Sequence, residues 1–164
     1  MKAQQIKEDS GPAVSVRKTL TVNASVSHAF KVFTEKHGTW WPRNTHHIGA
    51  QIPETVIIEP RAGGRWFERA ADGSECDWGK VLAWEPPGRL VLCWQLNTEW
   101  HYDPDLSTEV EVRFIAEGPR TTRVEFEHRN LERFGSKTEE MRRAFESEGG
   151  WTGILQGFVA AAGE

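Results

Sequence analysis

Alternation of apolar and polar residues runs through most of the chain and predicts strands. Residues 14–22 alternate well enough to form a first strand. Between residues 53 and 128, further alternating segments are separated mainly by turns rich in glycine and proline, a pattern typical of β-hairpins. These predicted strands are 54–59, 65–69, 75–84, 89–96, 108–117 and 122–128. Strands joined in this way predict one antiparallel sheet.

Helical spacing replaces alternation just after the first strand. Ser25 is a suitable N-cap for a segment whose apolar residues recur at positions 26, 29, 30 and 33, one face of a helix. We expect this helix to end at Gly38, with Thr39-Trp40-Trp41-Pro42 as a turn and residues 43–52 as a polar loop.

A longer helix is predicted at the C-terminus, over about residues 136–162. Ser136 is its expected cap, and Gly149–Gly150 should kink or break it, because glycine costs about 1 kcal/mol relative to alanine inside a helix. The resulting fold class is α+β, with helices packed on one face of the sheet. We expect a disordered tail over residues 1–13 and a single domain over residues 14–164.

Composition and charge exclude several classes of function. The chain of 164 residues carries 20 Lys and Arg against 24 Asp and Glu, a net charge of −4. Nucleic acid is not an expected partner, because phosphate binding needs clustered Lys and Arg. No apolar run approaches the roughly 20 residues of a membrane span, and residues 1–14 lack the apolar region of a secretion signal. We therefore expect a cytoplasmic protein that has no membrane partner.

The aromatic content is unusual and has two interpretations. The chain has eight Trp and eight Phe beside a single Tyr. These residues either form a tryptophan-rich core or line a cavity for a small hydrophobic or amphipathic ligand, since Trp suits walls that are apolar but not fully dry. Cys76 and Cys93 lie in predicted strands and are expected to be free thiols, not a disulfide.

Several local sequences, taken in order, resemble a known family. They are the strand–Pro-Pro–strand sequence Gly79–Trp94, the aromatic pair of Trp40-Trp41-Pro42, the strand Arg123–His128, and Gly150-Trp151 with Leu155. Together they resemble the heat-shock-ninety ATPase activator homologue (AHSA-like) family of the START-like, SRPBCC superfamily. The resemblance covers residues 14–162 and implies a helix-grip fold, in which an antiparallel sheet wraps a long C-terminal helix and leaves a cavity between them.

The alternation of side chains along the strands (strand parity) and the resemblance together predict which residues line that cavity. Parity places Trp94, Phe114, Phe126 and His128 on one face of the sheet. The resemblance adds residues near the first helix and on the early strands, and the C-terminal helix adds two of its apolar positions. The expected ligand-binding residues are Trp40, Trp41, Trp66, Trp94, Phe114, Phe126, His128, Trp151 and Phe158.

His128 is the polar residue on an otherwise apolar strand face. It could hydrogen-bond a ligand or titrate near neutral pH, or it could be an interior histidine with its hydrogen bonds satisfied. Glu148 could be its partner, or simply a solvated charge on the helix.

The remaining polar patterns indicate no metal or cofactor. Glu99 and His101–Asp105 lack the glycine of a calcium loop and the spacing of a zinc site, so a polar hairpin loop is expected. His46-His47 is an adjacent pair whose side chains should point apart. There is no phosphate loop and no Gly-x-Ser-x-Gly elbow, so no catalytic residue is nominated. Four arginines either form a basic rim for an acidic head group or are scattered on exposed strands: Arg61, Arg65, Arg69 and Arg89.

Three functions remain open at this point. The leading hypothesis is a cytoplasmic START-like domain that binds a small hydrophobic or amphipathic ligand between the sheet and the C-terminal helix. The second is a chaperone-related, stress-response or regulatory module with a protein partner, and the third is an enzyme acting on the bound molecule. The sequence also permits a homodimer.

Overall fold

The computed structural model describes residues 12–164, so most of the tail predicted over residues 1–13 lies outside the described residues. The strands are β1 Val16–Val22, β2 Thr55–Ile58, β3 Arg65–Arg69, β4 Glu75–Glu85, β5 Arg89–Trp94, β6 Thr108–Gly118 and β7 Thr121–Arg129. The helices are α1 Val26–Thr34, α2 His37–Trp40, the 3₁₀ segment η2 Leu131–Lys137, α3 Thr138–Glu146 and α4 Trp151–Ala162. None of the helices in this part of the chain is long and apolar enough to cross a membrane.

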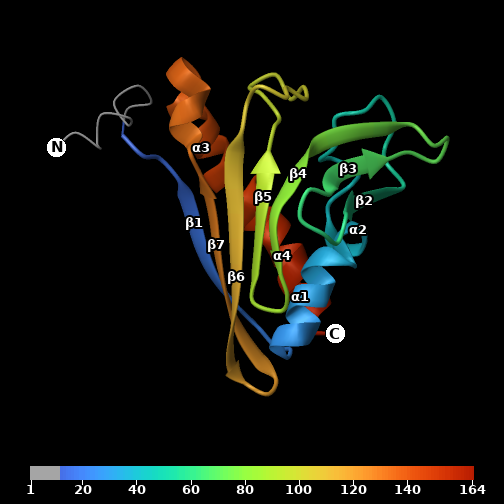
Figure 1. The fold of residues 1–164 in the computed structure, drawn as a ribbon, viewed down its shortest axis with the longest axis vertical. Coiled ribbons are helices and arrows are strands. Elements are labelled where there is room, and N and C mark those ends of the chain that lie inside the picture. The colour runs from blue at the N-terminus through green and yellow to red at the C-terminus, as the bar shows by residue number, and fades with distance from the viewer. Residues whose placement is uncertain (1–11) are drawn as a thin grey trace.

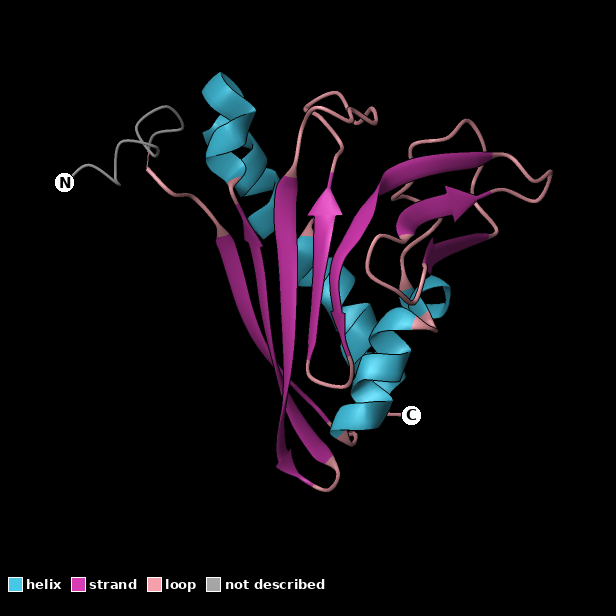
Figure 2. Ribbon diagram, in the orientation of Figure 1, coloured by secondary structure: helices cyan, strands magenta, loops and turns pink. Residues whose placement is uncertain are grey.

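All seven strands form one antiparallel sheet in the order β1-β7-β6-β5-β4-β3-β2. The first strand pairs with the last, Val16 opposite His128, so β1 forms one edge of the sheet and β2 forms the other. The sheet curls into a half-barrel, and helices α1, α2 and α4 lie on its concave side (Figures 1 and 2). The predicted α+β helix-grip fold is confirmed.

The concave face of the sheet forms the core. Leu90 of β5 lies opposite Val112 of β6, and Val112 lies opposite Phe126 of β7. These side chains are at most 2% exposed, and α4 covers the same face with its buried Leu155 and Phe158. Because side chains alternate between the two faces of a sheet, the apolar residues of each strand face the helices and the polar residues face outward.

The convex face of the sheet carries ion pairs. Glu111 accepts hydrogen bonds from Arg89 and Arg129 at 2.6 Å each. Burial alone would raise the pKa of Glu111, but the hydrogen bonds from these two arginines lower it below its ordinary value.

The first helix differs from its prediction. Ser25 is the N-cap as expected, with its hydroxyl accepting from the His28 N–H. The helix ends at Thr34 instead of Gly38, and Trp40 lies in the short helix α2 instead of a turn. The second helix is tied to the first by hydrogen bonds that the pattern does not reveal, including one from the Trp40 indole to the Val32 carbonyl at 2.8 Å.

The predicted break in the C-terminal helix is confirmed. Helix α3 stops at Glu146 and α4 begins at Trp151. A Cβ at Gly150 would lie 2.2 Å from the Ala144 carbonyl oxygen, so only glycine allows the two helices to approach this closely. The predicted Ser136 cap is wrong, because η2 precedes α3 and the Thr138 hydroxyl donates to carbonyls of that segment.

Candidate ligand-binding site

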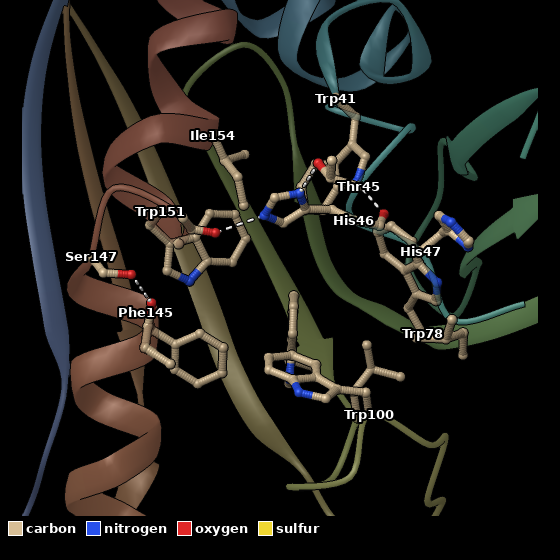
Figure 3. Close-up of a pocket in the computed structure, with 16 residues that line it drawn as sticks. Trp41, Thr45, His46, His47, Trp78, Trp100, Phe145, Ser147, Trp151 and Ile154 are labelled. Carbon is tan, nitrogen blue, oxygen red and sulfur yellow. Dashed lines mark hydrogen bonds between the residues drawn. The ribbon is translucent and has the colours of Figure 1, made fainter. Parts of the chain in front are cut away.

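A cavity of about 460 Å³ lies where the concave face, the loop after α2 and the break between α3 and α4 meet (Figure 3). Five tryptophans line it: Trp41, Trp78, Trp94, Trp100 and Trp151. The other lining residues are apolar, or carry hydroxyl, imidazole or backbone groups. Among the described residues, no Asp, Glu, Lys or Arg lines the cavity. It therefore suits an uncharged ring system better than a charged head group.

The indole rings form a continuous wall. The Trp41 ring centre lies 5.0 Å from that of Trp78 and 5.9 Å from that of Trp151. Trp94 continues the series, 5.7 Å from Trp151 and 6.4 Å from Trp100. The planes are tilted or perpendicular to one another, which is the favourable geometry for neighbouring aromatic rings.

A β-bulge brings Trp78 into this wall. Trp66 on β3 pairs with Gly79, but the next residue, Phe67, pairs with Asp77, so Trp78 has no partner in the ladder. The extra residue shifts the alternation along β4, so two successive residues, Trp78 and Gly79, face the same side of the sheet. This is the side on which the cavity lies. A Cβ at Gly79 would lie 1.7 Å from the Cys93 carbonyl oxygen, so the strand requires glycine there.

Glu68 on β3 holds the loop that closes one side of the cavity. Its carboxylate is 3% exposed and accepts three N–H groups. These are the backbone N–H of Ile48 at 2.8 Å, the backbone N–H of Gly49 at 3.0 Å and the Trp78 indole N–H at 2.8 Å. One buried carboxylate thus fixes both a loop and a wall residue.

His46 joins that loop to the helix break, and Figure 3 shows its ring between Thr45 and the segment that precedes Trp151. Its Nε2 lies 2.6 Å from the Gly149 carbonyl oxygen and its Nδ1 lies 2.7 Å from the Thr45 hydroxyl. A carbonyl can only accept, so Nε2 carries the proton, and Nδ1 of a neutral ring accepts from Thr45.

His128 does not line the cavity. It is fully buried, and its Nδ1 accepts from the Trp151 indole at 3.1 Å, so its Nε2 donates to the Thr108 hydroxyl at 2.8 Å. Burial lowers its pKa to about 3, which keeps the ring neutral. Glu148 is exposed and is not among its partners. The structure thus bears out the interior-histidine interpretation.

His37 is a second buried histidine with the same type of arrangement. The Trp66 indole donates to its Nε2 at 3.2 Å, and its Nδ1 donates to the Phe33 carbonyl at 3.0 Å. Burial lowers the pKa of His37 to about 3, although the hydrogen bond to Phe33 acts in the opposite direction.

The structure brings only some of the nominated wall residues to the cavity. Trp41, Trp94 and Trp151 line it. The other six are buried in the surrounding core: Trp40, Trp66, Phe114, Phe126, His128 and Phe158. Four arginines were predicted as a possible basic rim, but each is paired with a carboxylate on a strand or in the turn after β2, and none lines the cavity: Arg61, Arg65, Arg69 and Arg89.

The sequence patterns missed four wall residues with distinctive chemistry: His46, His47, Trp78 and Trp100. His46 and His47 lie in a polar loop, and their adjacent spacing indicates only that they would be poor metal ligands. Trp78 is displaced by a bulge, and Trp100 lies in a polar loop of the kind that alternation cannot place. The usable signal was the total of eight Trp, more than the predicted wall accounted for.

Comparison with known proteins relates the chain to one family. The family model described as Activator of Hsp90 ATPase homolog 1-like protein matches residues 23–163. An anthrahydroquino-gamma-pyrone synthase, Txn09, solved in complex with SUM, is 36% identical, with a TM-score of 0.63 over 89% of this chain and 95% of that chain.

Two further solved structures are informative. CalC from Micromonospora echinospora, described as a self-sacrificing resistance protein, is 35% identical, with a TM-score of 0.65 over 90% of this chain and 93% of that one. Protein MLL2253 from Mesorhizobium loti shares the fold at 20% identity, with a TM-score of 0.62 over 90% of this chain and 95% of that one. No curated protein matches the chain.

Proposed function

This chain belongs to the family of Activator of Hsp90 ATPase homolog 1-like proteins, and we propose that it binds a small, planar, uncharged aromatic molecule in its tryptophan-lined cavity. The observation that carries the proposal is the wall of five indoles with no charged side chain among the described lining residues. Such a wall contributes affinity by burying aromatic surface and offers nothing to neutralise a charged group.

The size of the cavity and the name of one relative support the same class of ligand. A volume of about 460 Å³ is within the usual range for small-molecule sites and accommodates a fused system of three or four rings. Txn09 is named as a synthase of an anthrahydroquino-gamma-pyrone, a fused aromatic compound. We therefore take a polycyclic aromatic compound of the polyketide type as the ligand class.

A fluorescence titration tests the proposal. The probe is 2-(hydroxymethyl)anthracene, an uncharged three-ring compound that accepts excitation energy from tryptophan. Trp100 is 44% exposed at the mouth of the cavity, so Trp100→Ala should fold and should weaken binding about ten-fold by removing one aromatic wall. Leu82 is 46% exposed on β4 and outside the cavity, so Leu82→Ala is the matched control and should bind normally.

The outcomes separate cavity binding from adsorption to exposed apolar surface. Saturable energy transfer that Trp100→Ala weakens and Leu82→Ala leaves unchanged supports the proposal. Equal effects of the two substitutions, or no saturable transfer from the wild-type protein, would rule it out.

Catalysis on the bound molecule is the second candidate function. It is favoured by the synthase name of Txn09, 36% identical to this chain, and by the two imidazoles of His46 and His47 in the wall. Among the described residues these are the only imidazole side chains that line the cavity. Turnover of a polycyclic polyketide by the wild type, lost in His46→Gln, would establish it.

The protein-interaction alternative has less support. Only three large apolar side chains of the described residues are exposed: Ile52, Leu82 and Trp100. Trp100 belongs to the cavity mouth, so little contiguous apolar surface is left for a chaperone or regulatory partner. The single domain, the cytoplasmic location, the stress-response role and the homodimer stay predictions.

A further inference from the structure

One buried indole in the cavity wall has no hydrogen-bond partner among the described residues. Three of the five tryptophans donate their N–H to protein groups: Trp41 to the His46 carbonyl, Trp78 to Glu68 and Trp151 to His128. Trp94 is 5% exposed, and its Nε1 has no partner among residues 12–164. A buried donor without an acceptor is rare and costs free energy, so it requires an explanation.

The neighbours of Trp94 cannot supply the missing acceptor. Phe145 and Trp151, whose ring centres lie 5.4 Å and 5.7 Å away, are aromatic rings without a free acceptor atom. His128, at 5.3 Å, already uses both of its ring nitrogens. The other buried unpaired atom in the described chain, Gln95 Oε1, does not line the cavity. Because Trp94 lines the cavity, a molecule bound there is in a position to supply the acceptor.

Trp100 is the one aromatic neighbour of Trp94 that is exposed. It stands edge-on to Trp94, 6.4 Å between ring centres, on the loop between β5 and β6. It is 44% exposed and has a φ of 63°, a left-handed conformation that few residues other than glycine adopt. The side of Trp94 that faces Trp100 is therefore the one at which a ligand atom can approach without displacing a buried ring.

We propose that Trp94 is a specificity-determining residue, whose N–H binds a carbonyl oxygen of a quinone-type aromatic ligand beside Trp100. The inference rests on the proposed function and adds the chemical group that the site selects. A carbonyl oxygen is a strong acceptor that carries no formal charge, so it satisfies the indole N–H without bringing a charge into an uncharged cavity.

A pair of matched probes tests the inference. The probes are 2-(hydroxymethyl)anthraquinone and 2-(hydroxymethyl)anthracene, which share the ring skeleton and the substituent and differ by two carbonyl groups. The wild type should bind the quinone about ten-fold more tightly, the value of one hydrogen bond. Trp94→Phe should abolish this preference, because it removes the N–H that the quinone carbonyl accepts from. The smaller ring costs both probes the same aromatic contact, so the ratio of the two affinities is the readout.

Trp41→Phe is the matched control. Trp41 and Trp94 are each 5% exposed and both line the cavity, but the Trp41 N–H is already donated to the protein. Trp41→Phe should keep the ten-fold preference.

Each outcome decides the inference. Equal affinities for the two probes in the wild type, or a preference that survives Trp94→Phe, would overturn the Trp94 subsite and leave the proposed function intact. Failure of both probes to bind would overturn the proposed function itself. If Trp94→Phe does not fold, the infrared carbonyl band of the bound quinone decides. A shift to lower frequency on binding to the wild type supports the hydrogen bond, and an unshifted band excludes it.

Discussion

Indole N–H groups and imidazole nitrogens determine the chemistry of this interior. Trp66 donates to His37 and Trp151 donates to His128, so each buried histidine is an acceptor at one nitrogen and a donor at the other. The donor-only indole fixes the tautomer, and both rings are held neutral. In a core rich in tryptophan and phenylalanine, these pairs satisfy polar groups that would otherwise destabilise the fold.

The buried histidines should make the protein sensitive to acid. Burial lowers the pKa of His37 and of His128 from 6.5 to about 3 in the folded state. The unfolded chain therefore binds more protons below pH 6.5, and the free energy of unfolding falls as the pH drops from 6.5 towards 3. Each histidine should contribute a slope of about 1.4 kcal/mol per pH unit.

A conservative substitution isolates this effect. Glutamine at position 128 can still accept from Trp151 and donate to Thr108, but it does not titrate. In urea denaturation between pH 4.5 and 6, His128→Gln should show a slope shallower by about 1.4 kcal/mol per pH unit. His101→Gln, at an exposed loop position, should match the wild type. A wild-type slope in His128→Gln would mean that His128 does not carry the acid sensitivity.

At the scale of elements, one carboxylate connects β3 to the cavity loop. Because Glu68 accepts from Ile48, Gly49 and Trp78, Glu68→Gln replaces an acceptor with an NH₂ group that faces an N–H donor. We expect a loss of about 1–3 kcal/mol in unfolding free energy. Exchange of the Ile48 and Gly49 amide hydrogens should become about ten-fold faster, because a loss of about 1.4 kcal/mol in the free energy of opening raises the open population ten-fold.

The control for Glu68→Gln is a carboxylate on the opposite, solvent-facing side of the sheet. Glu125 is exposed on β7 and pairs with Arg123, so Glu125→Gln should leave both stability and the exchange of the loop amides unchanged. Unchanged exchange at Ile48 and Gly49 in Glu68→Gln would show that other contacts hold the loop.

The junction between α3 and α4 offers a second test at this scale. A Cβ at Gly150 would lie 2.2 Å from the Ala144 carbonyl oxygen, a backbone atom that cannot move aside cheaply. Gly150→Ala should lower the free energy of unfolding by about 1–3 kcal/mol in urea denaturation. At Gly149 an added Cβ would meet only the Ser147 hydroxyl oxygen at 4.0 Å, so Gly149→Ala should be nearly neutral. Equal losses for the two variants would contradict this account of the break.

The elements themselves were largely predictable from the sequence. Each predicted strand lies within a few residues of its observed limits, since one face of every strand is buried and alternation follows burial. The errors occur where tertiary contacts decide. Helix α2 depends on the Trp40 indole reaching the Val32 carbonyl, and the start of α3 depends on Thr138 bonding to η2. Neither contact leaves a periodic signal in the sequence.

On the scale of the whole molecule, the site was less predictable than the fold. Strand parity shows which side chains point to the concave face, but not which of them α4 will cover. Phe114 and Phe126 have the same parity as Trp94, yet they are buried in the core outside the cavity. Trp78 reaches the wall only because a bulge shifts its side chain, and Trp100 only because its loop folds back over Trp94.

The cavity unites three distant parts of the chain, and this predicts how a ligand should act on the whole fold. Its walls come from residues 41–48, 78–100 and 144–154. A ligand seated among them binds only when all three are in place, so it stabilises the folded state as a unit. With 2-(hydroxymethyl)anthracene at 100 times its dissociation constant, the free energy of unfolding should rise by about 2.7 kcal/mol.

Hydrogen exchange distinguishes this global effect from attachment at the surface. Amides in all three segments should gain protection together when the anthracene probe binds, because a ligand in the cavity opposes the opening of each segment. The exposed hairpin between β6 and β7 should not respond locally, which makes it an internal control. A ligand that only stacked on Trp100 would protect the loop between β5 and β6 and leave the α3–α4 junction unchanged. That pattern would place the binding site outside the cavity, because a site at the mouth does not require the helix break or the loop after α2.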